Sequence, residues 1–177
     1  MNMKAIKVLM VALLLTGLFA CQGQKETEPT DQKAKYIFLF IGDGMGHAQM
    51  ALAESYLSYK AGKLGGEQVS FTRFPYLGTC STYSMDWSVT CSAAAGTAIA
   101  TGTKTNNNYL GVDVDGKPLE SMAYVLKRDG YKIGIMSSVQ VNHATPGAFY
   151  AHNIDRGNYY EISKEIAESG FLAPLIF

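Results

Sequence analysis

The chain has 177 residues, of which 47% are hydrophobic, and its eleven tyrosines and eight phenylalanines are sufficient for the core of one domain. Its fifteen lysines and arginines equal its fifteen acidic residues, and the part after residue 20 keeps thirteen bases against fifteen acids because Lys4 and Lys7 precede it. This composition excludes a wholly disordered chain, and the balanced charge gives no reason to expect nucleic-acid binding.

Residues 1–20 have the pattern of a secretion signal. A basic start precedes an apolar run at 8–19 that is too short to span a bilayer comfortably, and Ala20 is a small residue directly before Cys21. This pattern is similar to a bacterial lipobox, so we expect Cys21 to become the lipidated first residue of the mature chain. The alternative is an ordinary signal peptide followed by an incidental cysteine.

Residues 21–35 are largely polar and are expected to form the linker that follows a lipid anchor. Acyl chains on Cys21 would hold the protein to a membrane without a spanning helix. Gln22 stands where lipoproteins retained at the bacterial inner membrane commonly have aspartate. We therefore expect a lipid-anchored protein of the bacterial cell envelope, at the outer membrane or the periplasmic face.

Residues 36–41 form a continuous apolar run, followed by a glycine-rich turn at 42–46 and by helical spacing at 47–60. This order indicates an α/β unit that begins with a buried strand of a parallel sheet. Asp43 lies in the turn, where α/β proteins place ligands, and its carboxylate is a candidate metal ligand. The alternative is a tight turn that favours aspartate for its geometry. The turn lacks the glycine spacing of a dinucleotide site.

Ser92 begins a run of alanine, glycine and threonine that is predicted to form a helix. The unpaired N–H groups and partial positive charge of a helix start suit phosphate, so Ser92 is a candidate nucleophile. A serine hydroxyl needs activation, and because the G-x-S-x-G pattern is absent, activation by a metal with Asp43 as a ligand fits better than activation by a histidine. The alternative is a serine that only caps the helix.

The remaining segments extend the same pattern. Strands are predicted at 78–85 and 131–136, helices at 119–128 and 158–169, irregular segments at 63–75 and 103–117, and a short apolar tail at 171–176. Cys80 and Cys91 lie in a compartment where disulfides form, but a separation of eleven residues does not establish bonding distance, so both states stay open.

A third cluster runs from His143 to His152 and is followed by Arg156. It comes just after the strand predicted at 131–136, at the sheet edge that also carries Asp43. Thr145 offers an oxygen of the kind that Mg²⁺ takes, and the planar fork of Arg156 can bind two phosphate oxygens. Each residue alone could be a surface residue without a function, but together they are expected at one edge of the predicted sheet.

Three motifs now agree in order and spacing: F-I-G-D-G-M-G at 40–46, T-C-S-A-A-A-G-T-A through T-G-T-K-T at 90–105, and H-A-T-P through Arg156 at 143–156. Together they resemble alkaline phosphatase. The resemblance implies a three-layer αβα sandwich around a central, mostly parallel sheet. It also implies that residues 36–177 are the N-terminal part of this domain, with the C-terminal half missing.

The resemblance further implies a role for each residue of the site. Ser92 would become transiently phosphorylated and would ligate one zinc ion, while Asp43 would bridge a second zinc and a magnesium ion. Thr145 would ligate the magnesium, and Arg156 would hold two oxygens of the phosphoryl group. The implied cofactors are two Zn²⁺ and one Mg²⁺, the implied substrates are small phosphate monoesters, and a homodimer is left open.

Two residues beside these ligands depart from the best-known members. His143 stands where some members have aspartate, and in members with histidine the magnesium is bound less directly. Cys91 stands where the best-known members have an aspartate that positions the arginine, so we expect a changed phosphate affinity. The family's remaining zinc ligands lie beyond the sequence, so we expect little turnover by residues 21–177 alone.

Three other functions compete with this interpretation. A sulfatase is disfavoured because the matching nucleophile position is Ser92 and residue 96 is glycine where sulfatases have arginine. A phosphodiesterase of the same superfamily stays open because its specificity depends on other parts of the pocket. A non-catalytic or degenerate lipid-anchored remnant also stays open, and zinc stoichiometry would distinguish it from an enzyme.

Overall fold

The structure is a computed structural model that describes residues 33–171. It divides into one unit that ends at Phe40 and a second that begins at Ile41. The predicted signal peptide, the lipidation of Cys21, most of the linker and the tail from residue 172 lie outside the described residues. Among the helices of the described range, none has the length and apolar character needed to cross a membrane.

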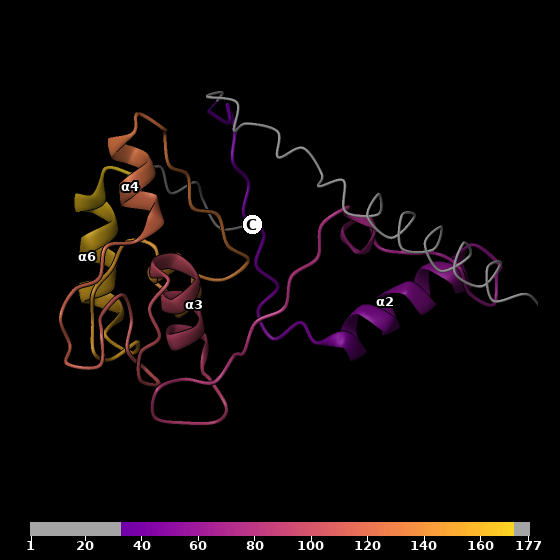
Figure 1. Cartoon of the computed structure of the whole chain (residues 1–177), viewed down its shortest axis with the longest axis horizontal. Coiled ribbons are helices and arrows are strands. Elements are labelled where there is room, and N and C mark those ends of the chain that lie inside the picture. Colours follow the sequence, from indigo (N-terminus) through magenta and orange to yellow (C-terminus); the bar gives the residue numbers. More distant parts are fainter. Residues whose placement is uncertain (1–32, 172–177) are drawn as a thin grey trace, which may run out of the picture. The chain divides into compact units, whose positions relative to one another are not determined.

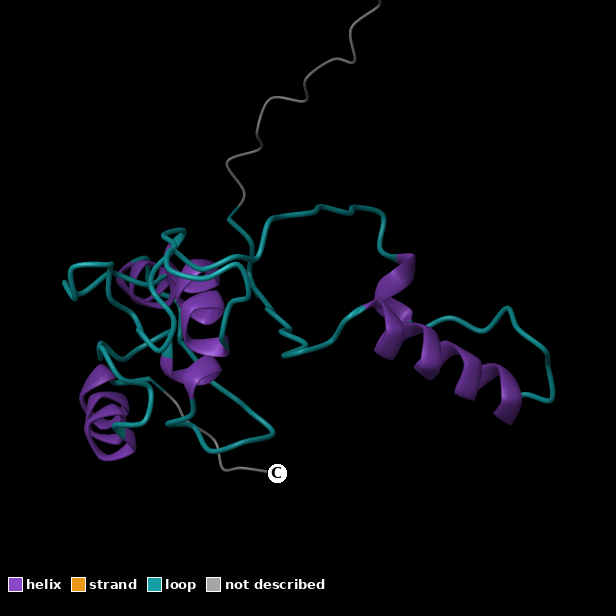
Figure 2. Ribbon diagram, turned by 90° about the horizontal axis from the view of Figure 1, so that it is seen from below, coloured by secondary structure: helices purple, strands orange, loops and turns teal. Residues whose placement is uncertain are grey.

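The three predicted strands are not formed in the described part of the chain. Figure 2 shows helices joined by loops, and pairing between described residues is limited to the isolated bridges Leu110–Asn153 and Val112–Pro118. The strand predicted at 36–41 is wrong in its burial as well, since Phe38 and Phe40 are 78% and 89% exposed. A strand needs a ladder of backbone hydrogen bonds with a neighbour, and the bridges between described residues involve none of these segments. The αβα sandwich is therefore not observed.

The helix predicted at 47–60 is confirmed as α2, His47–Lys60 (Figure 1). The Gly46 N–H at its start donates to Gln49 Oε1 at 3.1 Å, which satisfies one of the unpaired donors of a helix start. The loop predicted at 63–75 contains one 3₁₀ turn, η1, Ser70–Arg73. Glu54 of α2 accepts hydrogen bonds from the Val69 N–H and the Thr72 hydroxyl, so a carboxylate fastens this loop to the helix.

The helix predicted to begin at Ser92 is confirmed as α3, Ser92–Thr101. It is closed by Gly102 in the left-handed conformation, with φ of 73°. Its small residues allow close packing on α5, Ala144–Gly147, a single turn that the sequence pattern did not predict. A Cβ at Gly96 would lie 3.1 Å from the Ala148 Cβ, so glycine permits the close approach of these helices.

Two further helices complete the described part of the chain. The helix predicted at 119–128 is shorter, α4 at Met122–Arg128, because Ser121 is its N-cap residue. The helix predicted at 158–169 is confirmed as α6, Tyr159–Ser169, and Gly170 ends it with φ of 64°.

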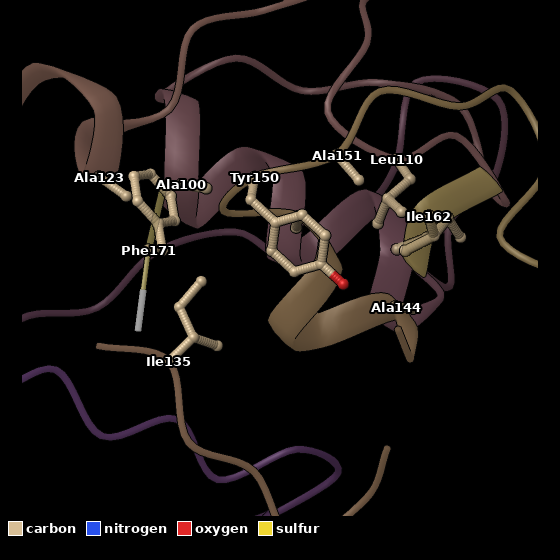
Figure 3. Close-up of a cluster of buried hydrophobic side chains, with 11 residues drawn as sticks. Ala100, Leu110, Ala123, Ile135, Ala144, Tyr150, Ala151, Ile162 and Phe171 are labelled. Atoms are coloured by element: carbon tan, nitrogen blue, oxygen red, sulfur yellow. The ribbon is translucent and has the colours of Figure 1, made fainter. Parts of the chain in front are cut away.

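The core lies among α3, α4, α5 and α6, and Tyr150 is its largest fully buried side chain. Figure 3 shows the Tyr150 ring between Ile135, Ala144 and Ala151. The Tyr150 hydroxyl donates to the Val141 carbonyl at 2.7 Å. Burial, together with the charge of Glu165, raises the pKa of Tyr150 well above its ordinary value. The cluster consists of Ala93, Ala100, Leu110, Ala123, Ile135, Ala144, Ala148, Tyr150, Ala151, Ile162 and Phe171.

The segment after Tyr150 is held by α6 and by the long connection after α3. Glu165 of α6 accepts from the His152 backbone N–H at 3.0 Å and lies 2.9 Å from the His152 Nδ1. Leu110 and Asn153 exchange two backbone hydrogen bonds of 2.8 Å. These contacts fix the start of the loop that carries Arg156.

Gly111 is predicted to be essential for this packing. Its φ is 62°, and a Cβ built on it would lie 1.9 Å from the Ala151 carbonyl oxygen. We expect Gly111→Ala to destabilise the fold by at least about 2 kcal/mol, because alanine is disfavoured at positive φ and also meets backbone. Thermal unfolding measures this effect.

Gly130→Ala is the matched control for this substitution. Gly130 also has positive φ, at 90°, but a Cβ there meets nothing within 4 Å. The Gly130→Ala variant therefore has the energetic cost of alanine at positive φ without a steric clash. Equal decreases in melting temperature for the two variants would contradict the predicted clash.

Candidate active site

Asp43, Ser92 and Thr145 come together in the structure although they are far apart in the sequence. The Ser92 hydroxyl donates to Asp43 Oδ1 at 3.1 Å, and the Thr145 hydroxyl donates to Asp43 Oδ2 at 2.8 Å. One carboxylate thus accepts two hydroxyl groups, one on each oxygen. The structure brings together the three predicted metal ligands.

Each of these side chains is placed by a short local motif. Asp43 lies in the turn before α2, where the Met45 N–H donates to the Gly42 carbonyl at 3.2 Å. Ser92 is the first residue of α3, and Thr145 lies in α5. The Gly96 position explains their meeting, since a Cβ there would be 3.5 Å from the Thr145 Cα. Glycine therefore brings the α5 backbone close to the helix that starts at Ser92.

Ser92 is not the N-cap of α3. Cys91 occupies the N-cap position, with extended backbone angles, and no side chain caps the helix. The alternative interpretation of Ser92 as a capping serine is therefore wrong, and its hydroxyl is directed to Asp43 instead. The first turn of this ten-residue helix carries no acidic side chain of its own, and the carboxylate at its start is that of Asp43.

Arg156 lies beside His143. One guanidinium nitrogen, Nη2, is 3.5 Å from the His143 Nε2. The His143 ring stacks on Tyr159 with centroids 6.5 Å apart, and its buried Nδ1 has no hydrogen-bond partner among the described residues. The sequence predicts that His143 lies next to the site residues, and its contact with Arg156 is consistent with that position.

Cys91 connects Arg156 to the nucleophile segment. Cys91 and Cys80 are both free, so they form no disulfide in this structure. Partial burial raises the pKa of the Cys91 thiol. Hydrogen bonds lower it by more than burial raises it, and they come from the backbone N–H groups of Asn108, Ala94 and Ala93 and from the Arg156 side chain. The net pKa lies below its ordinary value, so the surroundings of the sulfur favour negative charge.

The described residues fit one part of a metal site. Asp43, Ser92 and Thr145 present only oxygen atoms, which are the ligands that Mg²⁺ prefers. No group of three or more histidine, cysteine, aspartate or glutamate side chains that could hold a metal occurs within residues 33–171. The three residues thus supply part of a coordination shell and cannot complete it.

The family of the chain follows from a direct comparison. Residues 34–171 match the family model for alkaline phosphatase. The chain belongs to the alkaline phosphatase family. This match includes Asp43, Ser92, Thr145 and Arg156, so all four site residues lie inside the alkaline phosphatase region.

Individual alkaline phosphatases are similar over the same region. Alkaline phosphatase 4 of Bacillus subtilis (strain 168) is 35% identical over 173 residues, which are 92% of this chain and 37% of that protein. The cold-active alkaline phosphatase of Shewanella sp. gives a TM-score of 0.71 at 36% identity and covers 76% of this chain and 34% of that chain. The chain therefore spans roughly a third of the length of the relatives it matches.

A third comparison concerns a metal. A histidine-to-aspartate variant of TAB5 alkaline phosphatase, with Mg bound in its M3 site, gives a TM-score of 0.57 at 31% identity. It covers 65% of this chain and 34% of that chain. The solved neighbours have an α/β fold, so the predicted class is that of the family, although the described residues show helices and not the sheet.

Two residues near the site lie in the segment 103–117, for which the sequence pattern predicts only irregular structure. Asn107 Oδ1 accepts from the Cys91 N–H at 2.8 Å, and the Asn108 N–H donates to Cys91 Sγ at 3.1 Å. Three consecutive asparagines were the available signal, because asparagine binds backbone groups and tolerates left-handed conformations.

Proposed function

We propose that the protein to which this chain belongs hydrolyses phosphate monoesters through a phosphoserine on Ser92. The convergence of the Ser92 and Thr145 hydroxyls on the Asp43 carboxylate supports this proposal most directly. In the first step the Ser92 oxygen forms a bond to phosphorus, the ester P–O bond breaks, and the alcohol leaves with a proton. In the second step water hydrolyses the phosphoserine, which releases phosphate and restores the hydroxyl.

The residues of the chain have distinct roles in this proposal. Asp43 orients the Ser92 hydroxyl by accepting a hydrogen bond from it. The Thr145 hydroxyl donates a hydrogen bond to the other oxygen of the same carboxylate. The guanidinium of Arg156 binds two phosphoryl oxygens, and the start of α3 adds partial positive charge. Two Zn²⁺ and one Mg²⁺, held in part by Asp43, Ser92 and Thr145, would supply positive charge against the phosphoryl group.

The cellular setting is proposed from the sequence. A signal peptide at residues 1–20, a lipidated Cys21 and a linker over 21–35 would place residues 36–177 at the bacterial cell envelope. Residues 36–177 would form the N-terminal part of a three-layer αβα sandwich. The segments predicted as strands would pair with other strands of that sheet, which residues outside 33–171 would supply.

A second candidate is a non-catalytic lipid-anchored protein. It is favoured by one observation, the absence of a sufficient cluster of metal-binding side chains within residues 33–171. Both candidates are distinguished by isolating the native protein from membranes and treating it with a labelled phosphate monoester. Label on the peptide that contains Ser92, with two zinc ions per chain, supports the enzyme. A native protein with neither label nor bound zinc supports the non-catalytic candidate.

Cys91→Asp is expected to lower the KM of the whole enzyme about 3- to 10-fold. The sulfur lies beside Arg156, and a carboxylate there would form charge-assisted hydrogen bonds that hold the guanidinium in place for phosphate. Steady-state kinetics with a phosphate monoester measure the effect. Cys80→Asp, at an exposed position, is the control, and an unchanged or raised KM for the Cys91 variant would contradict the prediction.

A further inference from the structure

Asn108 has a backbone conformation that few residues adopt. Its φ is 70°, and it is the only non-glycine residue with positive φ within residues 33–171. Asparagine tolerates the left-handed region better than most residues, but the conformation still carries a cost of order 1 kcal/mol. Surrounding contacts must therefore hold Asn108 in place.

Those contacts join the two halves of the candidate site. The Asn108 N–H donates to Cys91 Sγ at 3.1 Å, and the Asn108 carbonyl accepts from the Arg156 N–H at 3.0 Å. Cys91 directly precedes Ser92. One residue thus connects the nucleophile segment to the loop that carries the arginine, and its φ and ψ set the angle between the two hydrogen bonds.

The nucleophile end of this connection is itself anchored by Asn107. Its side chain accepts from the Cys91 N–H at 2.8 Å and donates to the Val89 carbonyl at 3.1 Å. Its own N–H donates to Asp86 Oδ1 at 2.8 Å. The segment before Ser92 is therefore fixed, and Leu110 and Asn153 fix the start of the Arg156 loop, so a change at Asn108 would be transmitted mainly to Arg156 itself.

We propose that Asn108 is a positioning residue that sets the place of Arg156 relative to Ser92 through its left-handed backbone. The inference rests on the proposed phosphatase function, in which Arg156 binds the phosphoryl group. Leaving the left-handed region would break one of the two hydrogen bonds and release the arginine loop. Errors of about 1 Å at such a group reduce catalysis by up to about 100-fold.

The test compares three substitutions in the whole protein loaded with zinc and magnesium. Asn108→Gly keeps the conformation and both backbone contacts, whereas Asn108→Val strongly disfavours it. We expect the Kd of inorganic phosphate, measured by calorimetry, to rise at least about 5-fold for Asn108→Val and to stay within about 2-fold for Asn108→Gly. Asn108→Ala has a milder backbone penalty and is measured in the same way if the valine variant does not fold.

Amide hydrogen exchange gives a readout that needs no turnover. The Arg156 N–H should exchange at least about 10-fold faster in the valine variant, because it loses its acceptor, and should be unchanged in the glycine variant. Gly130→Ala, which introduces alanine at another positive φ, should leave both readouts unchanged.

The outcomes separate this inference from the proposed function. A valine variant, or its alanine substitute, with unchanged phosphate Kd and unchanged Arg156 exchange overturns the role of Asn108, even where turnover is normal. A protein without turnover whose phosphate Kd responds as expected supports the positioning role and refutes the phosphatase proposal. Loss of phosphate affinity in Gly130→Ala as well would overturn the inference, because a general loss of stability would then explain it.

Discussion

Ser92→Ala is expected to reduce phosphate monoester turnover by the whole enzyme by at least about 10³-fold and to remove all phosphoserine from the peptide that contains residue 92. The substitution removes the oxygen that would attack phosphorus. The Ser92 hydroxyl is the one directed to Asp43, and alanine cannot replace it as a nucleophile or as a metal ligand. Turnover and labelling with a phosphate monoester measure both effects.

The same substitution should leave the fold almost unchanged. Alanine is the best helix former, and the hydroxyl of Ser92 does not cap α3, so we expect a change in stability within about 0.5 kcal/mol. Ser138→Ala, at an exposed position, is the control and should keep full activity. Retention of more than about a tenth of the turnover by a folded Ser92→Ala protein would refute the proposed nucleophile.

Local patterns were sufficient to predict the helices. The helix at 47–60 follows from its spacing of alanine and leucine, and the helix at 158–169 follows from its spacing and from Gly170, which adopts the left-handed conformation expected of a terminator. Ser92 was correctly placed at the start of a helix. The sequence alone left open the alternative interpretation of Ser92 as the capping residue, because the residue at the N-cap is decided by backbone angles that a sequence pattern does not show.

The strands could not be predicted in the same way because a strand depends on segments far away in the chain. The apolar run at 36–41 has the composition of a buried strand, yet the side chains of residues 36–40 are exposed, and no bridge between described residues involves this segment. The contacts of Asn107 and Asn108 with Cys91 span sixteen and seventeen residues, and no local rule predicts them. The meeting of Asp43 with Ser92 and Thr145 was predicted from the family resemblance and from the expected sheet edge.

That meeting does not depend on the sheet. Asp43 is joined to Ser92 across 49 residues and to Thr145 across 102 residues by hydrogen bonds between side chains, while no strand is present in residues 33–171. Packing of α3 on α5 through Gly96 is sufficient to bring Ser92 and Thr145 together. The site is therefore organised first by helices, and the turn with Asp43 completes it.

Asp43→Asn is expected to remove bound metal from the whole enzyme and to reduce turnover at least about 100-fold. An amide has no net charge and one acceptor oxygen, so it cannot neutralise a divalent cation or present a separate oxygen to each hydroxyl. Metal content after dialysis, and the rise in melting temperature on adding zinc and magnesium, measure the loss. Metals that bind the folded state stabilise it by about 2.7 kcal/mol at 100 times their Kd, and this rise should shrink in the variant.

Asp115→Asn is the matched control because it removes the same charge at an exposed position whose carboxylate pairs with Lys117 and not with a residue of the candidate site. The Asp115 carboxylate pairs with Lys117 at 3.5 Å, and both side chains are largely exposed, so the pair contributes about 1 kcal/mol or less. This variant should keep its metals and turnover. If Asp43→Asn bound zinc and magnesium in the same ratio as Asp115→Asn, the carboxylate that joins Ser92 and Thr145 would not be a metal ligand. The hydrogen bonds to those hydroxyls would then serve only to hold the turn against α3 and α5.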